Sequence, residues 1–275
     1  MLAATLLALG AAVLHAGWNL AVKQSTVDRF LALWGQFLVA GIVALVGLVV
    51  VGGIPASGLP WAAVTGVVHV PYCVFLARAY RRSDFSLVYP VARGGGALLA
   101  GIGGVALLGD HLSAWGLVAL GVVTAGLVAL AGRATWSRLA DALAVAASIG
   151  IYSVADAKGV RVTHTPAYAL ATFAAIGLAV SAYGLARGQG PALVAAARTN
   201  WRRFVVIGLC TELTYSMVVL AFRSAPVGYV TALRESSVVL AAFIGWRLLH
   251  ERAGARRVAA AGTVLGGLVL LVVSR

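Results

Sequence analysis

Long apolar runs dominate this sequence and restrict what it can fold into. Each is close to the length of about 20 residues that a helix needs to cross the hydrocarbon of a bilayer. Short polar or glycine-rich breaks separate the runs. We expect ten transmembrane helices, at residues 2–21, 30–52, 60–80, 85–108, 112–131, 139–157, 167–187, 203–222, 226–249 and 254–273. The sequence therefore predicts an all-α polytopic membrane protein.

The charge content excludes several other classes of protein. Only 11% of the 275 residues are charged, against about 25% in soluble domains, and the mean hydropathy is +0.98. The formal net charge of +13 does not indicate a nucleic-acid binder, because the cations lie between the apolar runs, where they face lipid headgroups. The sequence contains no phosphate-binding loop, metal cluster or nucleophile motif, so we expect neither an enzyme nor a cofactor.

Lysine and arginine are distributed unevenly over the two sides of the predicted bundle. Of the 21 such residues, 15 fall in breaks on one side and 4 in breaks or the C-terminus on the other. Cytoplasmic loops carry the excess of positive charge. We therefore expect the cytoplasmic (inner) membrane as the location, with both termini outside the cytoplasm.

The chain repeats itself. Residues 91–131 match residues 232–272 at 14 of 41 positions, where roughly four would arise by chance in so biased a composition. Arg93 falls on Arg234 in this alignment, and the acid Asp110 falls on another acid.

The repeat predicts two halves of one transmembrane domain, residues 1–132 and 137–275, with five spans each. Because five is odd, the second half enters the membrane from the opposite side. The two five-helix repeats are then inverted, as alternating access between the two sides requires.

Four charged residues lie near the middle of predicted spans, where each costs a few kcal/mol to insert. They are Arg93, Glu212, Arg234 and Glu235. They could satisfy one another as two ion pairs. They could also form a site in which the two arginines hold an anionic group of a substrate, since guanidinium matches carboxylate and phosphate geometry, while Glu212 or Glu235 pairs with them or carries a proton.

Other polar and aromatic residues share helix faces with these charges. His15, Trp18, Asn19 and Lys23 lie on one face of the first span, and we expect Lys23 to extend to the headgroups. His69 and Glu212 are the two candidates for a titrating group that couples transport to protons. We predict substrate-binding roles for Trp18, Asn19, His69, Tyr72, Tyr89, Arg93, Tyr215 and Arg234, and proton-coupling or ion-pair roles for Glu212 and Glu235. Further candidates for a cavity are Tyr152, Asp156 and Tyr229.

Glycines at helical spacing predict close helix packing. Gly116, Gly121 and Gly126 form one such series, and the stretch 262–266 begins and ends with glycine. We interpret both as packing seams without a ligand role.

The ten spans, the two halves and an acid after the fourth and ninth spans resemble the EamA-type transporters of the drug/metabolite transporter superfamily. The acids stand in Leu108-Gly109-Asp110 and Leu249-His250-Glu251, which depart from the Gly-Glu step usual in that family. The resemblance implies a central cavity lined by spans one to four and six to nine, with spans five and ten at the periphery. Family members carry amino acids, nucleotide sugars, sugar phosphates or drugs.

Together these features predict a secondary active transporter, an exporter or exchanger, of small polar and anionic metabolites. Its expected partners are a small-molecule substrate, the lipid bilayer and a proton as a candidate coupling ion. The sequence leaves three alternatives open: a proton-coupled exporter of hydrophobic or cationic drugs, a non-transporting membrane scaffold, and a lipid flippase. It does not choose a substrate, a direction or an oligomeric state.

Overall fold

The computed structural model describes residues 2–109, 113–132, 134–222, 233–251 and 254–273. Within these ranges the secondary structure is helical, without a strand. Asp110, Tyr229 and the first residues of the expected ninth span lie outside the described residues.

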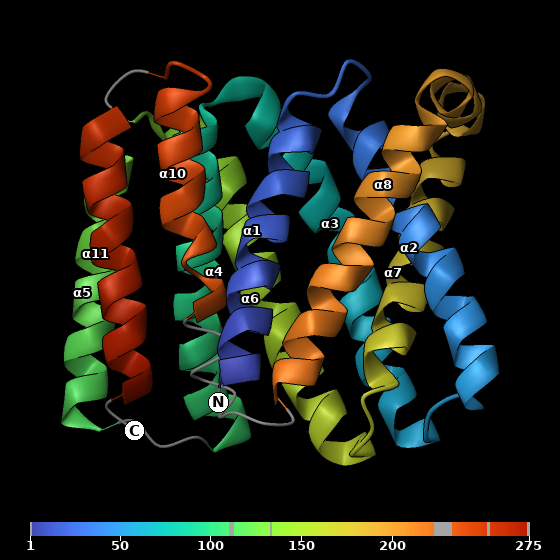
Figure 1. Ribbon diagram of the computed structural model, residues 1–275, viewed down its shortest axis with the longest axis horizontal. Coiled ribbons are helices and arrows are strands. Elements are labelled where there is room, and N and C mark those ends of the chain that lie inside the picture. The colour runs from blue at the N-terminus through green and yellow to red at the C-terminus, as the bar shows by residue number, and fades with distance from the viewer. Residues whose placement is uncertain (1, 110–112, 133, 223–232, 252–253, 274–275) are drawn as a thin grey trace.

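The helices stand side by side as a bundle (Figure 1). A short 3₁₀ turn, Ala56–Gly58, precedes α3. The α-helices are α1 Leu2–Lys23, α2 Arg29–Val51, α3 Leu59–Arg82, α4 Phe85–Leu108, α5 Ala114–Ala131, α6 Trp136–Thr163, α7 Tyr168–Ala186, α8 Gly190–Phe222, α10 Ser237–Arg247 and α11 Gly254–Val273.

Seven helices of the described part, α1 to α7, are long and apolar enough to cross a membrane, and α10 is a shorter apolar helix. Large apolar side chains such as Val49 and Leu107 are more than 70% exposed on the outside of the bundle. In water such a surface would be unfavourable, whereas in a bilayer it contacts lipid. The chain is therefore a multi-pass membrane protein.

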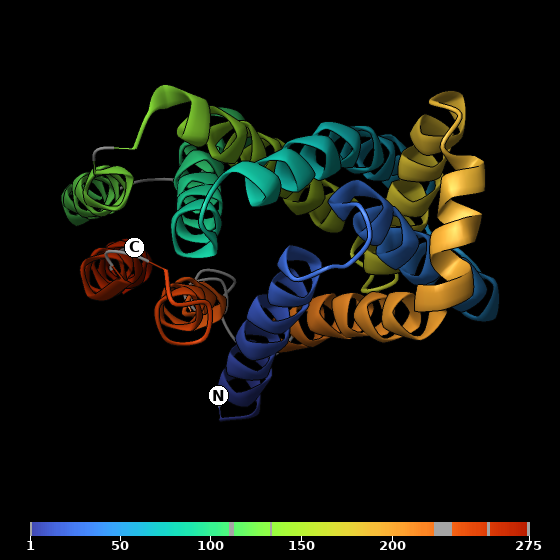
Figure 2. The ribbon, with the colours of Figure 1, turned by 90° about the horizontal axis from the view of Figure 1, so that it is seen from above.

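Two helices are longer than the sequence predicted. Helix α6 continues beyond the expected end at residue 157 to Thr163, because no helix-breaking residue precedes Pro166. The C-cap residue that follows is His164, whose φ of 53° is left-handed. Helix α8 begins at Gly190 and not at residue 203. Its first part lies across the end of the bundle, and the rest descends through it (Figures 1 and 2).

The expected ninth span is interrupted where its charges lie. Leu233 and Arg234 are helical, Glu235 and Ser236 form a turn, and α10 starts one residue later. The N–H of Ser236 donates to Leu233 O at 3.1 Å, and that of Val238 donates to Glu235 O at 2.9 Å. These three-residue bonds belong to a turn tighter than an α-helix. Interrupted helices in transporters commonly border binding sites.

Glycines allow two pairs of helices to approach closely. A Cβ on Gly177 of α7 would lie 2.9 Å from the Cα of Gly41 in α2. On the other side of the bundle α5 lies beside α11 (Figures 1 and 2), where Gly126 and Gly267 face backbone of the partner helix.

The predicted glycine seams are therefore only partly correct. Gly121, Gly262 and Gly266 face nothing within 4 Å. Glycines at helical spacing share a face, but the neighbouring helix contacts that face only where the two axes cross.

Candidate functional site

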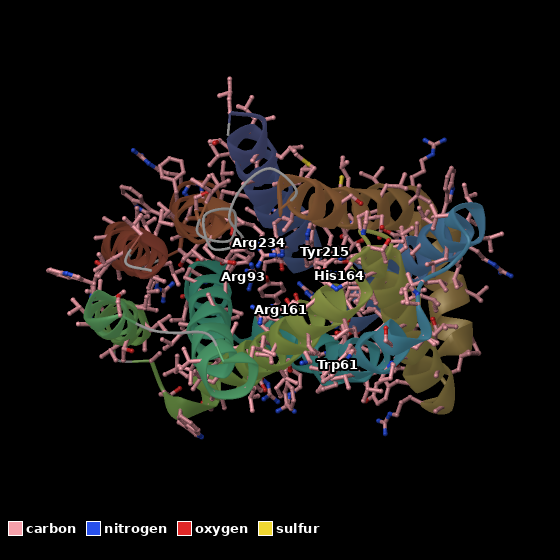
Figure 3. The ribbon with its side chains drawn as sticks, turned by 90° about the horizontal axis from the view of Figure 1, so that it is seen from below. Trp61, Arg93, Arg161, His164, Tyr215 and Arg234 are labelled. Carbon is pink, nitrogen blue, oxygen red and sulfur yellow. The ribbon has the colours of Figure 1, made fainter. Side chains whose placement is uncertain are left out.

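A cavity lies between the helices, with about 600 Å³ of space not filled by atoms, including its open part. Its walls come from α1, α2, α3, α4, α6, α7, α8 and Arg234, and Figure 3 shows Arg93, Arg234 and Tyr215 around the central opening. The lining residues are His15, Trp18, Phe37, Thr65, His69, Tyr72, Arg93, Tyr152, Asp156, Thr172, Phe173, Ile176, Thr211, Thr214, Tyr215, Val218 and Arg234.

Two arginines of the cavity share one carboxylate. Oε1 of Glu235 accepts a hydrogen bond from Arg93 and lies 3.2 Å from Nη2 of Arg234. Arg93 and Glu235 are buried, while the side chain of Arg234 is 19% exposed. One negative charge therefore faces two positive charges, and this group of three largely buried side chains carries a surplus positive charge.

A chain of hydrogen bonds runs along one face of α1. Nδ1 of His15 lies 2.7 Å from the hydroxyl of Tyr89. One turn later, Asn19 donates to His15 O at 2.9 Å and accepts from the hydroxyl of Tyr80 at 2.8 Å. The chain joins α1 to α3 and α4 and satisfies polar groups that are buried in the membrane.

His69 presents one ring nitrogen to its own helix. Nδ1 lies 2.7 Å from Thr65 O, so Nδ1–H donates and Nε2 is left as an acceptor in the neutral ring. The ring centroid lies 4.5 Å from that of Tyr152 and 5.2 Å from that of Tyr72. His69 is thus part of an aromatic wall.

Asp156 of α6 is a carboxylate in the same cavity. Its Oδ1 accepts from Oγ1 of Thr65 at 2.6 Å and from the hydroxyl of Tyr168 at 3.4 Å. The hydroxyl of Tyr215 also interacts with this carboxyl group. Among the described residues, Asp156 is thus the carboxylate of the cavity lining, and it comes from a different helix than either arginine.

One segment of the chain matches a known protein family. Residues 139–273 match the model of the EamA-like transporter family. Over this segment, just under half of the chain, the protein is similar to EamA-like transporters. This similarity supports a role in transport across a membrane. No curated protein matches the sequence.

A solved structure described only as "Crystal structure of protein" has a similar fold. It is 20% identical in sequence, with a TM-score of 0.65 over 99% of this chain and 98% of its own. At that identity the likeness extends to the fold alone.

The fold brings together most of the residues that the sequence singled out. Trp18, His69, Tyr72, Arg93, Tyr215 and Arg234 line the cavity. Asn19, Tyr89 and Glu235 lie behind this lining and bind residues that form it.

Glu212 is the exception, because it does not line the cavity. It is buried on α8, and neither of its oxygens has a hydrogen-bond partner among the described residues. The expected arrangement of two ion pairs is therefore wrong, because Glu235 pairs with both arginines and Glu212 pairs with neither.

Sequence reasoning missed several lining residues. Thr172 is a single hydroxyl in an apolar run, which carries no signal of a site. Thr211 and Thr214 stand beside Glu212 in a polar stretch of the sequence, which did carry such a signal. Thr65 could have been found, because it precedes His69 by one helical turn and Tyr72 by two. Phe37 and Phe173 are indistinguishable in sequence from aromatic residues of the core.

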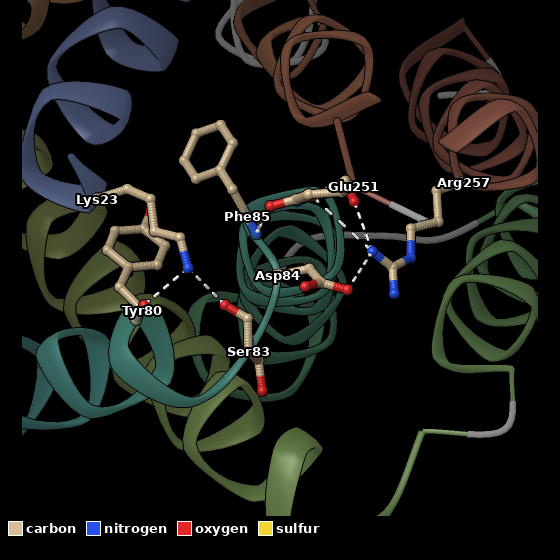
Figure 4. A network of polar contacts seen from close by, with 8 residues as sticks. Lys23, Tyr80, Ser83, Asp84, Phe85, Glu251 and Arg257 are labelled. Carbon is tan, nitrogen blue, oxygen red and sulfur yellow. Dashed lines mark hydrogen bonds and ion pairs between the residues drawn. The ribbon is translucent and has the colours of Figure 1, made fainter. Parts of the chain in front are cut away.

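At the end of the bundle where α1 ends, a second set of polar contacts joins three segments (Figure 4). Nη1 of Arg257 lies 2.8 Å from Oδ2 of Asp84 and 3.9 Å from Oε2 of Glu251. Nζ of Lys23 donates to Tyr80 O at 2.8 Å and Ser83 O at 2.7 Å. We call Lys23, Asp84, Glu251 and Arg257 the end network.

The expectation that Lys23 extends to the headgroups is therefore wrong. Its ammonium group binds the carbonyl of Tyr80 in the last turn of α3 and that of the C-cap residue Ser83, and the carbonyls at a helix end have no partner within the helix. A cation is also favourable at the negative end of the helix dipole. The contact fixes the end of α1 against the turn between α3 and α4.

Proposed function

We propose that this chain is a secondary active transporter that moves small anionic metabolites across the cytoplasmic membrane by alternating access. The observation that carries the proposal is the single carboxylate shared by Arg93 and Arg234. A surplus cation in a low-dielectric cavity is costly unless an anion joins it. A carboxylate, phosphonate or phosphate group of a substrate supplies that anion and matches guanidinium geometry.

The packing of helices supports two inverted repeats. Helix α1 packs against α8, and α6 packs against α3. In the two halves α1 corresponds to α6, and α3 corresponds to α8. If the halves are exchanged, the pair α1–α8 therefore becomes the pair α6–α3. The pairs α2–α7 and α5–α11 each consist of two corresponding helices and remain the same. Trp18 of α1 and Tyr152 of α6, on helices that correspond in the two halves, both line the cavity. Two related packings of this kind provide the states that alternating access needs.

The basic residues support an orientation with the end network at the cytoplasmic side. Arg81 pairs with Asp28, and Arg78 and Arg82 pair with Asp141, at the same end of the bundle as Lys23. Both termini are then outside the cytoplasm, in accordance with the positive-inside rule.

Glu212 is the group we propose as the proton carrier. An ionised carboxylate at this place would be unpaired in apolar surroundings, at a cost of several kcal/mol. A protonated carboxyl group avoids that cost. Glu212 alternates between the two forms when the packing of α8 against α1 and α2 changes.

The proposal is tested by uptake into proteoliposomes and by thermal stability of the purified protein. The ligands are panels of carboxylates, phosphonates, sugar phosphates and cationic dyes. A ligand at a hundred times its Kd adds about 2.7 kcal/mol to the free energy of unfolding. We expect anions to stabilise the protein and to be transported, and cationic dyes to do neither.

The decisive variants change the charge of the arginine group. Arg93→Gln leaves one cation for Glu235 and should abolish the response to anions. The double variant Arg93→Gln/Glu235→Gln restores the surplus charge on Arg234 and should recover part of the response. Arg81→Gln, in an exposed ion pair with Asp28, is the matched control and should respond as the wild type does.

Two results would contradict the proposal. Transport of cationic dyes that survives Arg93→Gln would favour export of cationic drugs. A protein that folds but moves no ligand in proteoliposomes at any pH would be a scaffold.

A further inference from the structure

We infer that the first part of α8, residues 190–203, lies along the membrane surface and binds the headgroups of anionic phospholipids through Arg198 and Arg202. We call these residues the interfacial segment. The inference concerns a surface outside the cavity, so it does not depend on which substrate the cavity takes. The partner is the lipid surface at the end of the bundle that carries the end network.

The interfacial segment lies across the end of the bundle, whereas the rest of α8 descends through it (Figures 1 and 2). Arg203 holds the segment in place by donating a hydrogen bond to Ala21 O in the last turn of α1. Within the segment, Asn200 donates to Ala196 O at 3.2 Å. Because the bundle spans the bilayer, a helix across its end lies at the level of the headgroups and not in the hydrocarbon.

The interfacial segment has one buried face and one exposed face. Leu193, Ala196 and Phe204 are buried and pack into the core of the bundle. Val194 and Trp201 are both 55% exposed, and their spacing of seven residues, two helical turns, places them on the same side of the helix. Tryptophan is favoured at the boundary between hydrocarbon and headgroups. This uncovered apolar row therefore faces lipid.

Two arginines border the apolar row. Arg198 follows Val194 by four residues and Arg202 follows Arg198 by four, so both lie on the exposed side near Trp201. The guanidinium carbon of Arg202 lies 5.4 Å from the centre of the Trp201 ring. Among the residues that the structure describes, neither arginine forms an ion pair, whereas Arg81 at the same end does. No acid of the described chain therefore neutralises these two cations at the membrane surface.

The headgroups that complement these cations carry a net negative charge. A guanidinium group donates two parallel hydrogen bonds to a phosphate group, and every phospholipid has a phosphate. Phosphatidylcholine carries its own cation beside the phosphate, which opposes a second arginine, whereas phosphatidylglycerol does not. A basic residue near an anionic membrane surface contributes about a fivefold preference, which corresponds to about 1 kcal/mol.

The interfacial segment continues into the wall of the cavity. Thr211, Thr214 and Tyr215 line the cavity from α8, and a single helix connects them to Arg198 and Arg202. A lipid bound to these arginines therefore restrains the end of a helix that borders the candidate site. We expect anionic lipid to stabilise the folded protein for this reason.

A role in membrane insertion alone makes a different prediction. Cytoplasmic arginines set the orientation of a membrane protein whichever lipids they contact afterwards. If Arg198 and Arg202 did only this, the folded protein would bind phosphatidylglycerol equally well without them.

Native mass spectrometry of the purified full-length protein tests the inference. Phosphatidylglycerol and phosphatidylcholine with identical acyl chains are titrated separately, so that only the headgroup differs, and the Kd of each bound lipid is measured. We expect phosphatidylglycerol to bind the wild type more tightly. Arg198→Gln/Arg202→Gln should weaken the tightest binding of phosphatidylglycerol by about five- to thirtyfold, the range for one or two arginines, and should leave the Kd of phosphatidylcholine within about threefold.

Arg81→Gln/Arg82→Gln is the matched control. It removes two positive charges from the same end of the bundle, at arginines that pair with Asp28 and Asp141. It should preserve the tight binding of phosphatidylglycerol.

Three results would overturn the inference. The first is phosphatidylglycerol that binds the wild type no more tightly than phosphatidylcholine, a comparison that needs no variant. The second is an equal loss of binding in the control, which would assign the effect to net charge. The third comes from thermal unfolding in inorganic phosphate: stabilisation of the wild type that is lost in Arg198→Gln/Arg202→Gln would assign the two arginines to a soluble anion.

Discussion

The carboxylate of Glu251 accepts a hydrogen bond from the backbone N–H of Ser86 at 2.8 Å. Its other oxygen accepts from the N–H of Phe85 at 2.6 Å. Asp84, at the N-cap position of α4, makes no cap bond of its own, and its carboxylate binds Arg257 instead. A residue far away in the sequence therefore caps α4, and the turn after α10 is fixed to the helix that carries Arg93.

We expect Glu251→Ala to destabilise the protein and to loosen this end of the bundle. Loss of a helix N-cap costs about 0.5–2 kcal/mol, and Arg257 loses one of its two acids. Thermal unfolding measures the first effect. Reaction of the fully buried thiol of Cys73 with maleimide, in a Cys210→Ser background, measures the second.

Asp28→Ala is the matched control for Glu251. Asp28 lies at the same end of the bundle and caps α2 by accepting from Phe30 N at 2.9 Å, but its carboxylate pairs with Arg81, which is outside the end network. It should lower the Tm without exposing Cys73. Equal labelling of the two variants would show that the end network does not hold the bundle closed.

The crossing of α2 and α7 should be sensitive to one methyl group. In Gly177→Ala the new Cβ would lie 2.9 Å from Gly41 Cα and 2.9 Å from Phe37 O. Both are backbone atoms, which cannot rotate out of the way as a side chain can. Overpacking of this kind costs about 1–3 kcal/mol, so we expect a lower Tm in detergent. Gly262→Ala, on an exposed face with nothing within 4 Å, should be neutral or gain up to about 1 kcal/mol from helix propensity. The reverse order of Tm values would contradict the packing described.

Glu212→Gln should separate coupling from transport. The variant cannot release a proton, so a pH gradient should no longer drive accumulation, while exchange of substrate at equal pH continues. Because glutamine stays neutral where the carboxylate lacks a partner, the Tm should not fall. Both rates are measured in proteoliposomes with Asp141→Asn as control. Accumulation that still follows the pH gradient in Glu212→Gln would exclude this residue as the carrier.

The sequence predicted the helices more accurately than their ends. A helix in lipid must satisfy its own backbone, so twenty apolar residues suffice to predict one, and α4 begins and ends where expected. The extension of α6 to Thr163 was missed because charged residues such as Lys158 and Arg161 were read as a loop, although they are compatible with a helix that continues past the hydrocarbon.

The sequence allowed us to predict those residues of the candidate site whose charged side chains are costly to bury in lipid. Arg93 and Arg234 stand in apolar runs, and a charge there indicates a binding site or an ion pair because it needs a partner. The choice of Glu235 over Glu212 as that partner was not predictable. Both acids stand in mid-span, and only the turn at Glu235 and the position of α8 decide which of them reaches the arginines.

By itself the sequence determined that this chain lies in a membrane as helices and which of its residues carry charge into the apolar runs. These properties follow from composition and spacing, which act locally along the chain. The tertiary structure alone decided that Glu235 is shared, that Asp156 faces the same cavity, and that Glu251 caps α4. Such contacts join residues that are distant in sequence, and they depend on the angles at which helices cross, which no single helix specifies.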